Sequence, residues 1–283
     1  MNDLKITSPV LLLLFLFFIS CKNKQLYKSP EGYNINKPEK FVMKSSLREI
    51  SGITFIKGKE DVLYAIEDEA GKLFSFTKES ENLTYSKFGK KGDYEDLTIV
   101  NNKMVAVLKS NGSIYMFSVN EIGKEKIDSV KEYENILPEG EYEGLAADST
   151  KLIALCKNCP GDKEKKEVSI YTLQQFPGDS LTVTNTFKVD ITIIQTKDEN
   201  GKEKFHPSGI AKNPVTHEWF VISSVNKLLL ILDEQWKATA FYPLDPSLFK
   251  QPEGITFNSK GDLYISNEGG DGDANILLFR YQK

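Results

Sequence analysis

A short motif that occurs five times constrains this chain more than any other feature of its 283 residues. In each copy, a serine or glutamate precedes Gly or Asp, and Ile or Leu then begins an apolar run. The copies are Ser51-Gly52-Ile53, Glu95-Asp96-Leu97, Glu143-Gly144-Leu145, Ser208-Gly209-Ile210 and Glu253-Gly254-Ile255. Counted at the middle residue, successive copies are 44, 48, 65 and 45 residues apart. This spacing is typical of a propeller blade and not of a helical repeat.

Each motif opens a series of short apolar runs that are separated by polar turns. The first series has runs at 53–55, 62–66, 72–76 and 83–88. The second has runs at 97–99, 104–108, 113–117 and, more weakly, 127–130. Four such strands per repeat predict one antiparallel sheet per motif. We therefore expect an all-β fold, a five-bladed β-propeller over residues 41–283, with six blades as the alternative if the long segment 174–205 adds a sheet.

The fifth repeat is one strand short, since no further apolar run follows residues 276–281. The segment 39–44 has the pattern of a strand and lies before the first motif. Pairing this segment with the last repeat would complete the fifth sheet. It would also close the ring and remove the exposed strand edges that an open row of sheets leaves.

The N-terminus has the pattern of a lipoprotein signal peptide. An apolar run at 9–19 is too short for a membrane span, which needs roughly 20 residues, and Ser20-Cys21 follows it. A small residue before a cysteine resembles the bacterial lipobox, in which the cysteine is acylated. We expect a signal peptide at 1–20, a lipidated Cys21 that binds the bilayer and a flexible tether at 21–40. A cleaved secretory signal and an uncleaved anchor are the alternatives.

The charge of the chain excludes one class of partner. Its 36 basic and 40 acidic residues give a net charge of −4, which provides no electrostatic footprint for nucleic acid. We expect a monomer in the cell envelope, lipid-anchored on the periplasmic side or at the outer membrane.

The motif residues are expected to meet at one mouth of the central channel, because the first strand of a blade is the innermost. That ring consists of Ser51, Glu95, Glu143, Ser208 and Glu253. Converging carboxylates raise one another's pKa unless a cation neutralises them, and hard oxygen ligands favour Ca²⁺ or Mg²⁺ over zinc. The alternative is that Glu and Ser begin these turns because they accept local backbone N–H bonds.

The second strand of each blade returns to the same mouth, so the polar residues at its end are further candidates. Asp68, Asn158 and Glu268 occupy such ends. Together with the ring, they predict a mouth lined by oxygen atoms. An unknown small-molecule or protein ligand is expected to bind there.

The order of the motifs, namely Ser, Glu, Glu, Ser and Glu, resembles that of the SdiA-regulated (YjiK-like) family over residues 41–283. The resemblance implies a five-bladed propeller in the envelope with a calcium ion near the channel glutamates. By motif match, the implied metal ligands are Glu95, Glu143 and Glu253. The second motif differs from the family pattern in having Asp96 where its neighbours have Gly.

Two further features have structural interpretations. Cys156 and Cys159 form a C-x-x-C pair without the βαβ context of a thioredoxin-type site. In an oxidising compartment they are expected to form a small disulfide, since two ligands alone do not make a zinc site. His206 directly precedes the fourth motif and is interpreted as a loop residue that could face the mouth.

Two functions are compatible with these features. The first is a binding or scaffold module of the envelope that holds a divalent cation at the channel mouth. The alternative is a metal-dependent hydrolase of lactone, ester or phosphoester substrates, in which the cation acts as a Lewis acid. Hydrolysis also requires a general base, for which Glu268, Asp68 and His206 are candidates. No nucleophile with an adjacent base is apparent, so no catalytic residue is assigned and binding is favoured.

Overall fold

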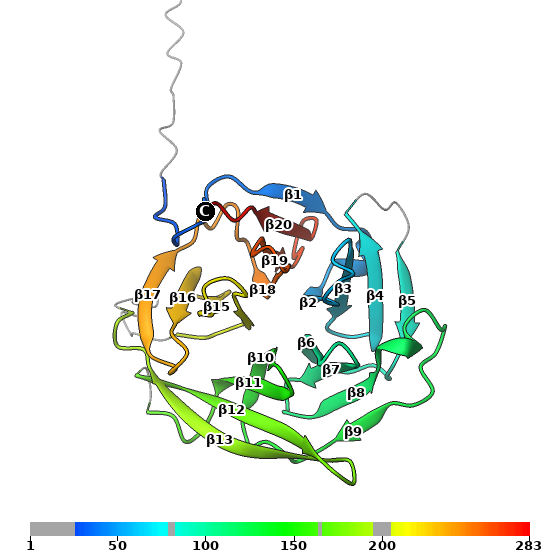
Figure 1. Ribbon diagram of the computed structural model, residues 1–283. Coiled ribbons are helices and arrows are strands. Elements are labelled where there is room, and N and C mark those ends of the chain that lie inside the picture. The colour runs from blue at the N-terminus through cyan, green and yellow to red at the C-terminus, as the bar shows by residue number, and fades with distance from the viewer. Residues whose placement is uncertain (1–25, 79–82, 164–165, 195–204) are drawn as a thin grey trace, which may run out of the picture.

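Five four-stranded antiparallel sheets surround a central axis in the computed structural model (Figure 1). The structure describes residues 26–78, 83–163, 166–194 and 205–283. The five-bladed β-propeller expected from the motif is confirmed. Within the described residues, no helix is long and apolar enough to cross a membrane.

The blades follow the chain in order, and the first strand of each lies nearest the axis (Figure 1). Blade 1 contains β2 (Ile50–Phe55), β3 (Val62–Glu67), β4 (Lys72–Thr77) and β5 (Thr84–Lys87). Blade 2 contains β6 (Tyr94–Val100), β7 (Met104–Lys109), β8 (Ile114–Ser118) and β9 (Lys131–Tyr133). Blade 3 contains β10 (Glu141–Asp148), β11 (Lys151–Asn158), β12 (Glu167–Phe176) and β13 (Ser180–Asp190). Blade 4 contains β14 (Gly209–Lys212), β15 (Trp219–Ser223), β16 (Leu228–Leu232) and β17 (Ala238–Pro243). Two short 3₁₀ helices, η1 (Ser45–Leu47) and η2 (Val119–Glu121), lie in connections.

Blade 5 combines both ends of the chain. It contains β18 (Pro252–Phe257), β19 (Leu263–Asn267) and β20 (Asn275–Phe279), and its outer strand is β1 (Glu39–Val42). β1 pairs antiparallel to β20, with Glu39 opposite Leu278 and Val42 opposite Asn275. The expected closure is therefore present. The six-bladed alternative is excluded, because the described residues form five sheets and the segment to Asp190 belongs to the long β12–β13 hairpin of blade 3.

The core lies between the blades, since both faces of each sheet are covered by the neighbouring sheets. The second strands accordingly show nearly continuous burial, as in β15 and β19, in which every residue is buried. A strand with two covered faces does not alternate between apolar and polar residues. This explains the uninterrupted apolar runs in the sequence.

Part of the segment expected to be a tether belongs to the folded body. Tyr33 and Ile35 are 6% and 1% exposed and contribute to the core between blades 4 and 5. The Tyr33 hydroxyl donates to the Gly261 carbonyl oxygen at 2.6 Å and accepts from the Asn213 side chain at 2.9 Å. Residues 1–25, with the expected signal peptide and Cys21, lie outside the described residues.

The repeated Gly or Asp position is where adjacent inner strands approach most closely. A Cβ atom on Gly209 would lie 2.6 Å from the Glu253 carbonyl oxygen of blade 5. One on Gly254 would lie 2.5 Å from the Ser266 hydroxyl and would also meet the Ser51 carbonyl oxygen of blade 1. The motif thus sets the contact from each blade to the next, which is why its middle residue is small in four of the five copies.

Candidate cation site at the channel mouth

In four blades, the pairing between the first and second strands is irregular at the motif. The regular pairing between the first and second strands is interrupted at 50–53, 94–96, 142–144 and 252–255. Each interruption includes the first residue of the motif, namely Ser51, Glu95, Glu143 or Glu253. Bulges release a residue from the ladder and redirect its side chain, and they are frequent beside functional sites. The glutamates of three different blades are therefore presented by the same local distortion.

The glutamates lie close enough to interact electrostatically. Burial, followed by the charge of Glu143, raises the pKa of Glu95 to about 9. Burial and then Glu143 likewise raise the pKa of Glu253 to about 7. Burial also raises the pKa of Glu143, although its hydrogen bond to Lys157 opposes the change. Without a bound cation, Glu95 is therefore protonated at neutral pH and Glu253 is near the midpoint of its titration.

One lysine compensates part of this charge. Lys157, near the end of β11, donates from its Nζ to the Glu143 carboxylate at 2.6 Å. Among the described residues, neither Glu95 nor Glu253 forms an ion pair. The charge of Lys157 nevertheless lowers the pKa of both groups, and Lys227 interacts electrostatically with Glu253.

The two serines of the ring have structural hydrogen bonds. The Ser208 hydroxyl donates to the Pro252 carbonyl oxygen at 2.7 Å and accepts the Ser224 N–H at 3.1 Å, which ties blade 4 to blade 5. The Ser51 hydroxyl lies 3.5 Å from the Glu49 carbonyl oxygen. Both side chains are buried, at 6% exposure for Ser51 and 5% for Ser208. The local-bonding interpretation of the motif therefore accounts for its serines, whereas the glutamates have no comparable bonds to the backbone among the described residues.

Asp96 explains the exception in the second motif. Its side chain is 1% exposed, and one carboxyl oxygen accepts the Leu97 N–H at 2.8 Å. The other accepts the Leu145 N–H of blade 3 at 2.7 Å. Burial raises the pKa of Asp96 well above its usual value. Here a hydrogen bond between blades replaces the close contact that glycine makes elsewhere in the ring.

The residues predicted at the ends of the second strands have different surroundings. Asn158 is exposed. Glu268 accepts a hydrogen bond from the Gln251 side chain. Burial, followed by Glu49, Glu67 and Glu268, raises the pKa of Asp68 to about 7. Asp68 thus belongs to an acidic group at the edge of blade 1.

Distances between ligand atoms distinguish this acidic group from the glutamate ring. Among the described residues, Glu49, Glu67 and Asp68 have carboxyl oxygens within 4.8 Å of one another. Cys156, Cys159 and Asp162 satisfy the same criterion, but the two sulfurs form a disulfide. The carboxyl oxygens of Glu95, Glu143 and Glu253, which are all described residues, do not lie within 4.8 Å of one another. One ion would contact all three of them only after their side chains turn toward the axis.

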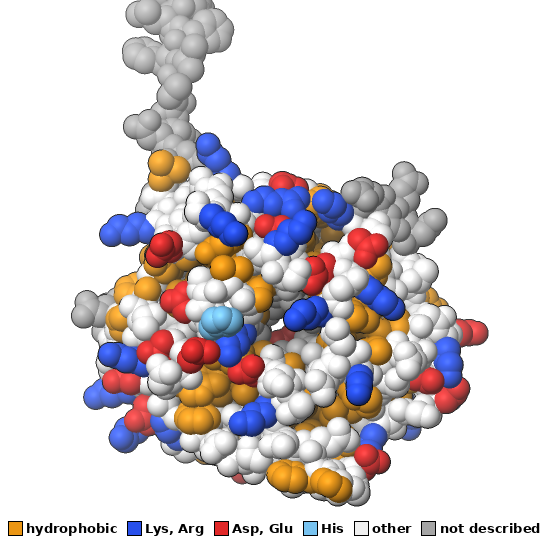
Figure 2. Space-filling view, in the orientation of Figure 1, with side chains coloured by type: hydrophobic (Ala, Val, Ile, Leu, Met, Phe, Trp, Pro, Cys, Tyr) orange, Lys and Arg blue, Asp and Glu red, His pale blue; other side chains and the backbone are white. Residues whose placement is uncertain are grey.

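A cavity of about 380 Å³ opens beside the ring, between blades 3, 4 and 5. Its lining includes Glu143, Glu253, Lys157, His206 and Ser208. Figure 2 shows a hollow near the axis of the propeller, with acidic and basic side chains around it. Ring residues and His206 therefore share a space large enough for a small molecule.

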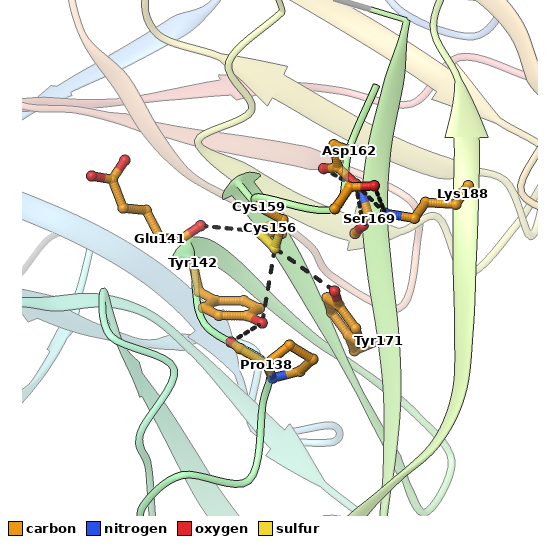
Figure 3. The surroundings of a disulfide bond; sticks show 10 residues. Pro138, Glu141, Tyr142, Cys156, Cys159, Asp162, Ser169, Tyr171 and Lys188 are labelled. Carbon is orange, nitrogen blue, oxygen red and sulfur yellow. Dashed lines mark hydrogen bonds and ion pairs between the residues drawn. A yellow bond between two sulfur atoms is a disulfide. The ribbon is translucent and has the colours of Figure 1, made fainter. Parts of the chain in front are cut away.

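Cys156 and Cys159 form a disulfide at the end of β11, close to Tyr142 and Tyr171 (Figure 3). The Cys156 sulfur is 3.3 Å from the Glu141 carbonyl oxygen, and the Cys159 sulfur lies 3.9 Å and 3.8 Å from the hydroxyls of Tyr142 and Tyr171. Lys157 is inside the four-residue ring that the disulfide closes. The bridge thus constrains the backbone that carries the partner of Glu143.

Lys157 is the residue near the mouth that the sequence did not single out as part of the site. It stands beside Asn158 at the same strand end, but its charge gave no reason to place it among cation ligands. The available signal was that side chains along a strand point alternately to its two faces. Lys157 and Leu155 therefore lie on the same face of β11. Leu155 pairs with Gly144, the residue after Glu143, so Lys157 lies near that glutamate.

Comparisons with known proteins agree with the fold. No curated protein matches the chain significantly. A glucose dehydrogenase structure is 12% identical, with a TM-score of 0.52, over 85% of this chain and 99% of that one. A PQQ-bound aldose sugar dehydrogenase from Streptomyces coelicolor is 12% identical, with a TM-score of 0.48, over 87% and 99%. A streptogramin B lyase is 13% identical, with a TM-score of 0.45, over 86% and 98%. At these identities, the likeness to the first shows a shared fold alone.

The profile of one protein family spans most of the chain. It matches residues 28–270, which include all five motifs and the closing strand β1. Together with the five-bladed ring and its ordered glutamates, this match shows that the chain belongs to the SdiA-regulated family.

Proposed function

We propose that this protein is a lipid-anchored β-propeller of the cell envelope that binds a divalent cation at Glu95, Glu143 and Glu253. Ca²⁺ is the preferred ion in this proposal. In this proposal, Cys21 carries the lipid and the propeller acts as a binding or scaffold module. A small molecule or a protein would dock at the channel mouth, above the ion.

The observation that carries the proposal is the bulge shared by the three glutamate-bearing inner strands. In blades 2, 3 and 5, this irregular pairing coincides with the glutamate of the motif. Burying carboxylates together is costly, and proteins retain such groups where a cation or a specific partner compensates them. The repetition of this arrangement supports a role beyond turn formation.

The charges fit a divalent ion. Lys157 balances Glu143, whereas no ion pair within the described residues balances Glu95 or Glu253. Two carboxylates without a salt bridge of their own match an ion of charge +2. The donors are carboxylate oxygens, which suit Ca²⁺ better than zinc. The ion would connect blades 2, 3 and 5 through their inner strands.

A metal-dependent hydrolase is the second candidate, and the cavity beside the ring favours it. This cavity of about 380 Å³ brings His206 and Ser208 to the same space as Glu143 and Glu253. A bound cation would polarise a carbonyl or phosphoryl oxygen there, and His206 is placed to exchange a proton with a bound substrate. The Ser208 hydroxyl already bonds two backbone groups, so it is a poor nucleophile.

Calorimetric titration of the chelator-treated protein with Ca²⁺ tests the proposal. We expect one saturable site that is lost when Glu95, Glu143 and Glu253 are all replaced by Gln, which keeps the side-chain volume. Glu139→Gln, at an exposed glutamate shortly before β10, is the matched control and should bind as the parent does. Unchanged Ca²⁺ affinity in the triple variant would refute the site.

A turnover assay separates the two candidate functions. A panel of lactones, aryl esters and phosphoesters would be incubated with the calcium-loaded protein. Turnover that disappears in His206→Ala while Ca²⁺ affinity is retained would establish the hydrolase. Absence of turnover across the panel would support the binding module.

A further inference from the structure

A second cavity lies outside the channel, between blades 1 and 2, and has a volume of about 740 Å³. Five lysines line it, namely Lys87, Lys90, Lys91, Lys109 and Lys126. Glu132 is the one carboxylate among its lining residues. In a chain of net charge −4, this is a local concentration of positive charge.

Little of this positive charge is neutralised by the protein itself. Lys91 pairs with Glu69 at 3.1 Å, and the other four lysines have no ion pair among the described residues. The Glu132 carboxylate accepts a hydrogen bond from the Tyr115 hydroxyl. After Glu69 and Glu132 are counted, the lining retains a net charge of about +3.

Two of the lysines are held next to each other by the backbone. Lys87 and Lys126 form an isolated parallel β-bridge. The Lys87 N–H donates to the Glu125 carbonyl oxygen at 3.0 Å, and the Ile127 N–H donates to the Lys87 carbonyl oxygen at 2.9 Å. Adjacent like charges on paired strands destabilise the fold. An anion bound between them would remove that cost.

The loop that carries Lys90 and Lys91 is fixed in place. The Tyr94 hydroxyl donates to the Lys90 carbonyl oxygen at 2.9 Å, and the Gly92 N–H donates to the Glu69 carbonyl oxygen at 2.9 Å. Gly89 packs so closely on Tyr94 that a Cβ atom at this position would collide with the phenol oxygen. A fixed loop loses less entropy when its lysines bind a ligand.

The aromatic side chains of the cavity wall are also packed in fixed positions. Phe88 and Tyr94 are buried, and their ring centroids are 5.1 Å apart. The Lys109 ammonium lies 5.8 Å from the centre of the Tyr94 ring. The lysines are thus arranged around a rigid apolar floor.

We propose that this cavity binds a ligand that carries two or more phosphate groups. All the cationic groups in the lining are lysines, which bind phosphate as point charges. A phosphate monoester carries about 1.5–2 negative charges at neutral pH, so two groups match the net charge of the lining. The volume lies within the range of small-molecule sites.

The site is tested by calorimetric titration with pyrophosphate in the presence of EDTA, so that the result is independent of the channel cation. We expect the parent protein to bind pyrophosphate at least tenfold more tightly than inorganic phosphate. The double variant Lys87→Gln/Lys126→Gln should lose roughly tenfold in affinity per lysine. Without ligand it should unfold at the same temperature as the parent or higher, because the like-charge contact is gone.

The matched control is Lys57→Gln/Lys59→Gln, which removes two exposed lysines from the turn between β2 and β3. It should retain the parent affinity for pyrophosphate. Equal weakening in both double variants, or equal affinity of the parent for phosphate and pyrophosphate, would overturn the proposal.

Vesicles containing cardiolipin, which has two phosphates, distinguish a lipid headgroup from a soluble ligand. Vesicle binding that pyrophosphate displaces assigns the cavity to a headgroup, and binding of pyrophosphate alone assigns it to a soluble molecule. Vesicle binding that persists in the presence of pyrophosphate and in Lys87→Gln/Lys126→Gln would count against this cavity.

Discussion

Replacing Glu95 with Gln should stabilise the ion-free protein at neutral pH. The pKa of Glu95 is about 9 in the folded protein, raised first by burial and then by Glu143, against 4.5 for an unperturbed glutamate. Below pH 4.5 the carboxyl group is protonated in both the folded and the unfolded state, so it contributes no pH-dependent term. Between pH 4.5 and 9 the unfolded state ionises first, and the free energy of unfolding falls as the pH rises.

The magnitude follows from the difference between the ordinary pKa and the assay pH. At pH 7 the difference is about 2.5 units, which corresponds to about 3 kcal/mol at 1.36 kcal/mol per unit. Gln is neutral at every pH and has nearly the same shape as the protonated Glu. For a domain of this size, about 3 kcal/mol corresponds to an increase in Tm of roughly 6–12 °C.

Thermal unfolding followed by circular dichroism from pH 4.5 to 8, with EDTA, measures this effect. The parent should lose stability relative to Glu95→Gln as the pH rises, and the two should converge near pH 4.5. Glu139→Gln should follow the parent throughout. Added Ca²⁺ should stabilise the parent and leave Glu95→Gln less affected. A Glu95→Gln protein that melts below the parent at pH 7.5 in EDTA would refute the reasoning.

Three further predictions concern the ring and its closure. Gly254→Ala should lower the free energy of unfolding by about 1–3 kcal/mol in urea titrations, because its methyl group would collide with blade 1. The control is Gly161→Ala, where the added Cβ would come no closer than 3.6 Å to the Lys188 Nζ, and an equal loss in both variants would disprove the packing argument. Lys157→Gln should tighten Ca²⁺ binding in calorimetry, since it removes the cation that already occupies Glu143; weaker binding would mean that the lysine supports the ion site. Deletion of residues 1–43 removes β1 and exposes the edge of β20. The shortened protein should therefore have a lower Tm and should associate, as measured by light scattering. A monomer that melts at the parent temperature would contradict this closure.

The sequence predicted the order of the blades because the information is local and repeated. Each blade begins with the same small-residue motif and continues with short strands and polar turns, so the number and phase of the sheets could be read by counting. The weakest strand was misplaced: the outer strand of blade 2 was expected at 127–130 and lies at Lys131–Tyr133. Ile127 is buried beside Lys87 instead. A three-residue edge strand has too few side chains to show a pattern.

The sequence by itself therefore determined the ring and its closure by residues 39–44, and its motif predicted which residues lie at the channel mouth. Only the tertiary structure decided how those residues are compensated. Lys157 reaches Glu143 from the neighbouring strand, and Asp96 bonds the Leu145 N–H from another blade. Tyr33 packs between blades 4 and 5 although a polar, proline-rich segment surrounds it. Such contacts depend on positions far apart in the chain, and a local pattern of residue types does not record them.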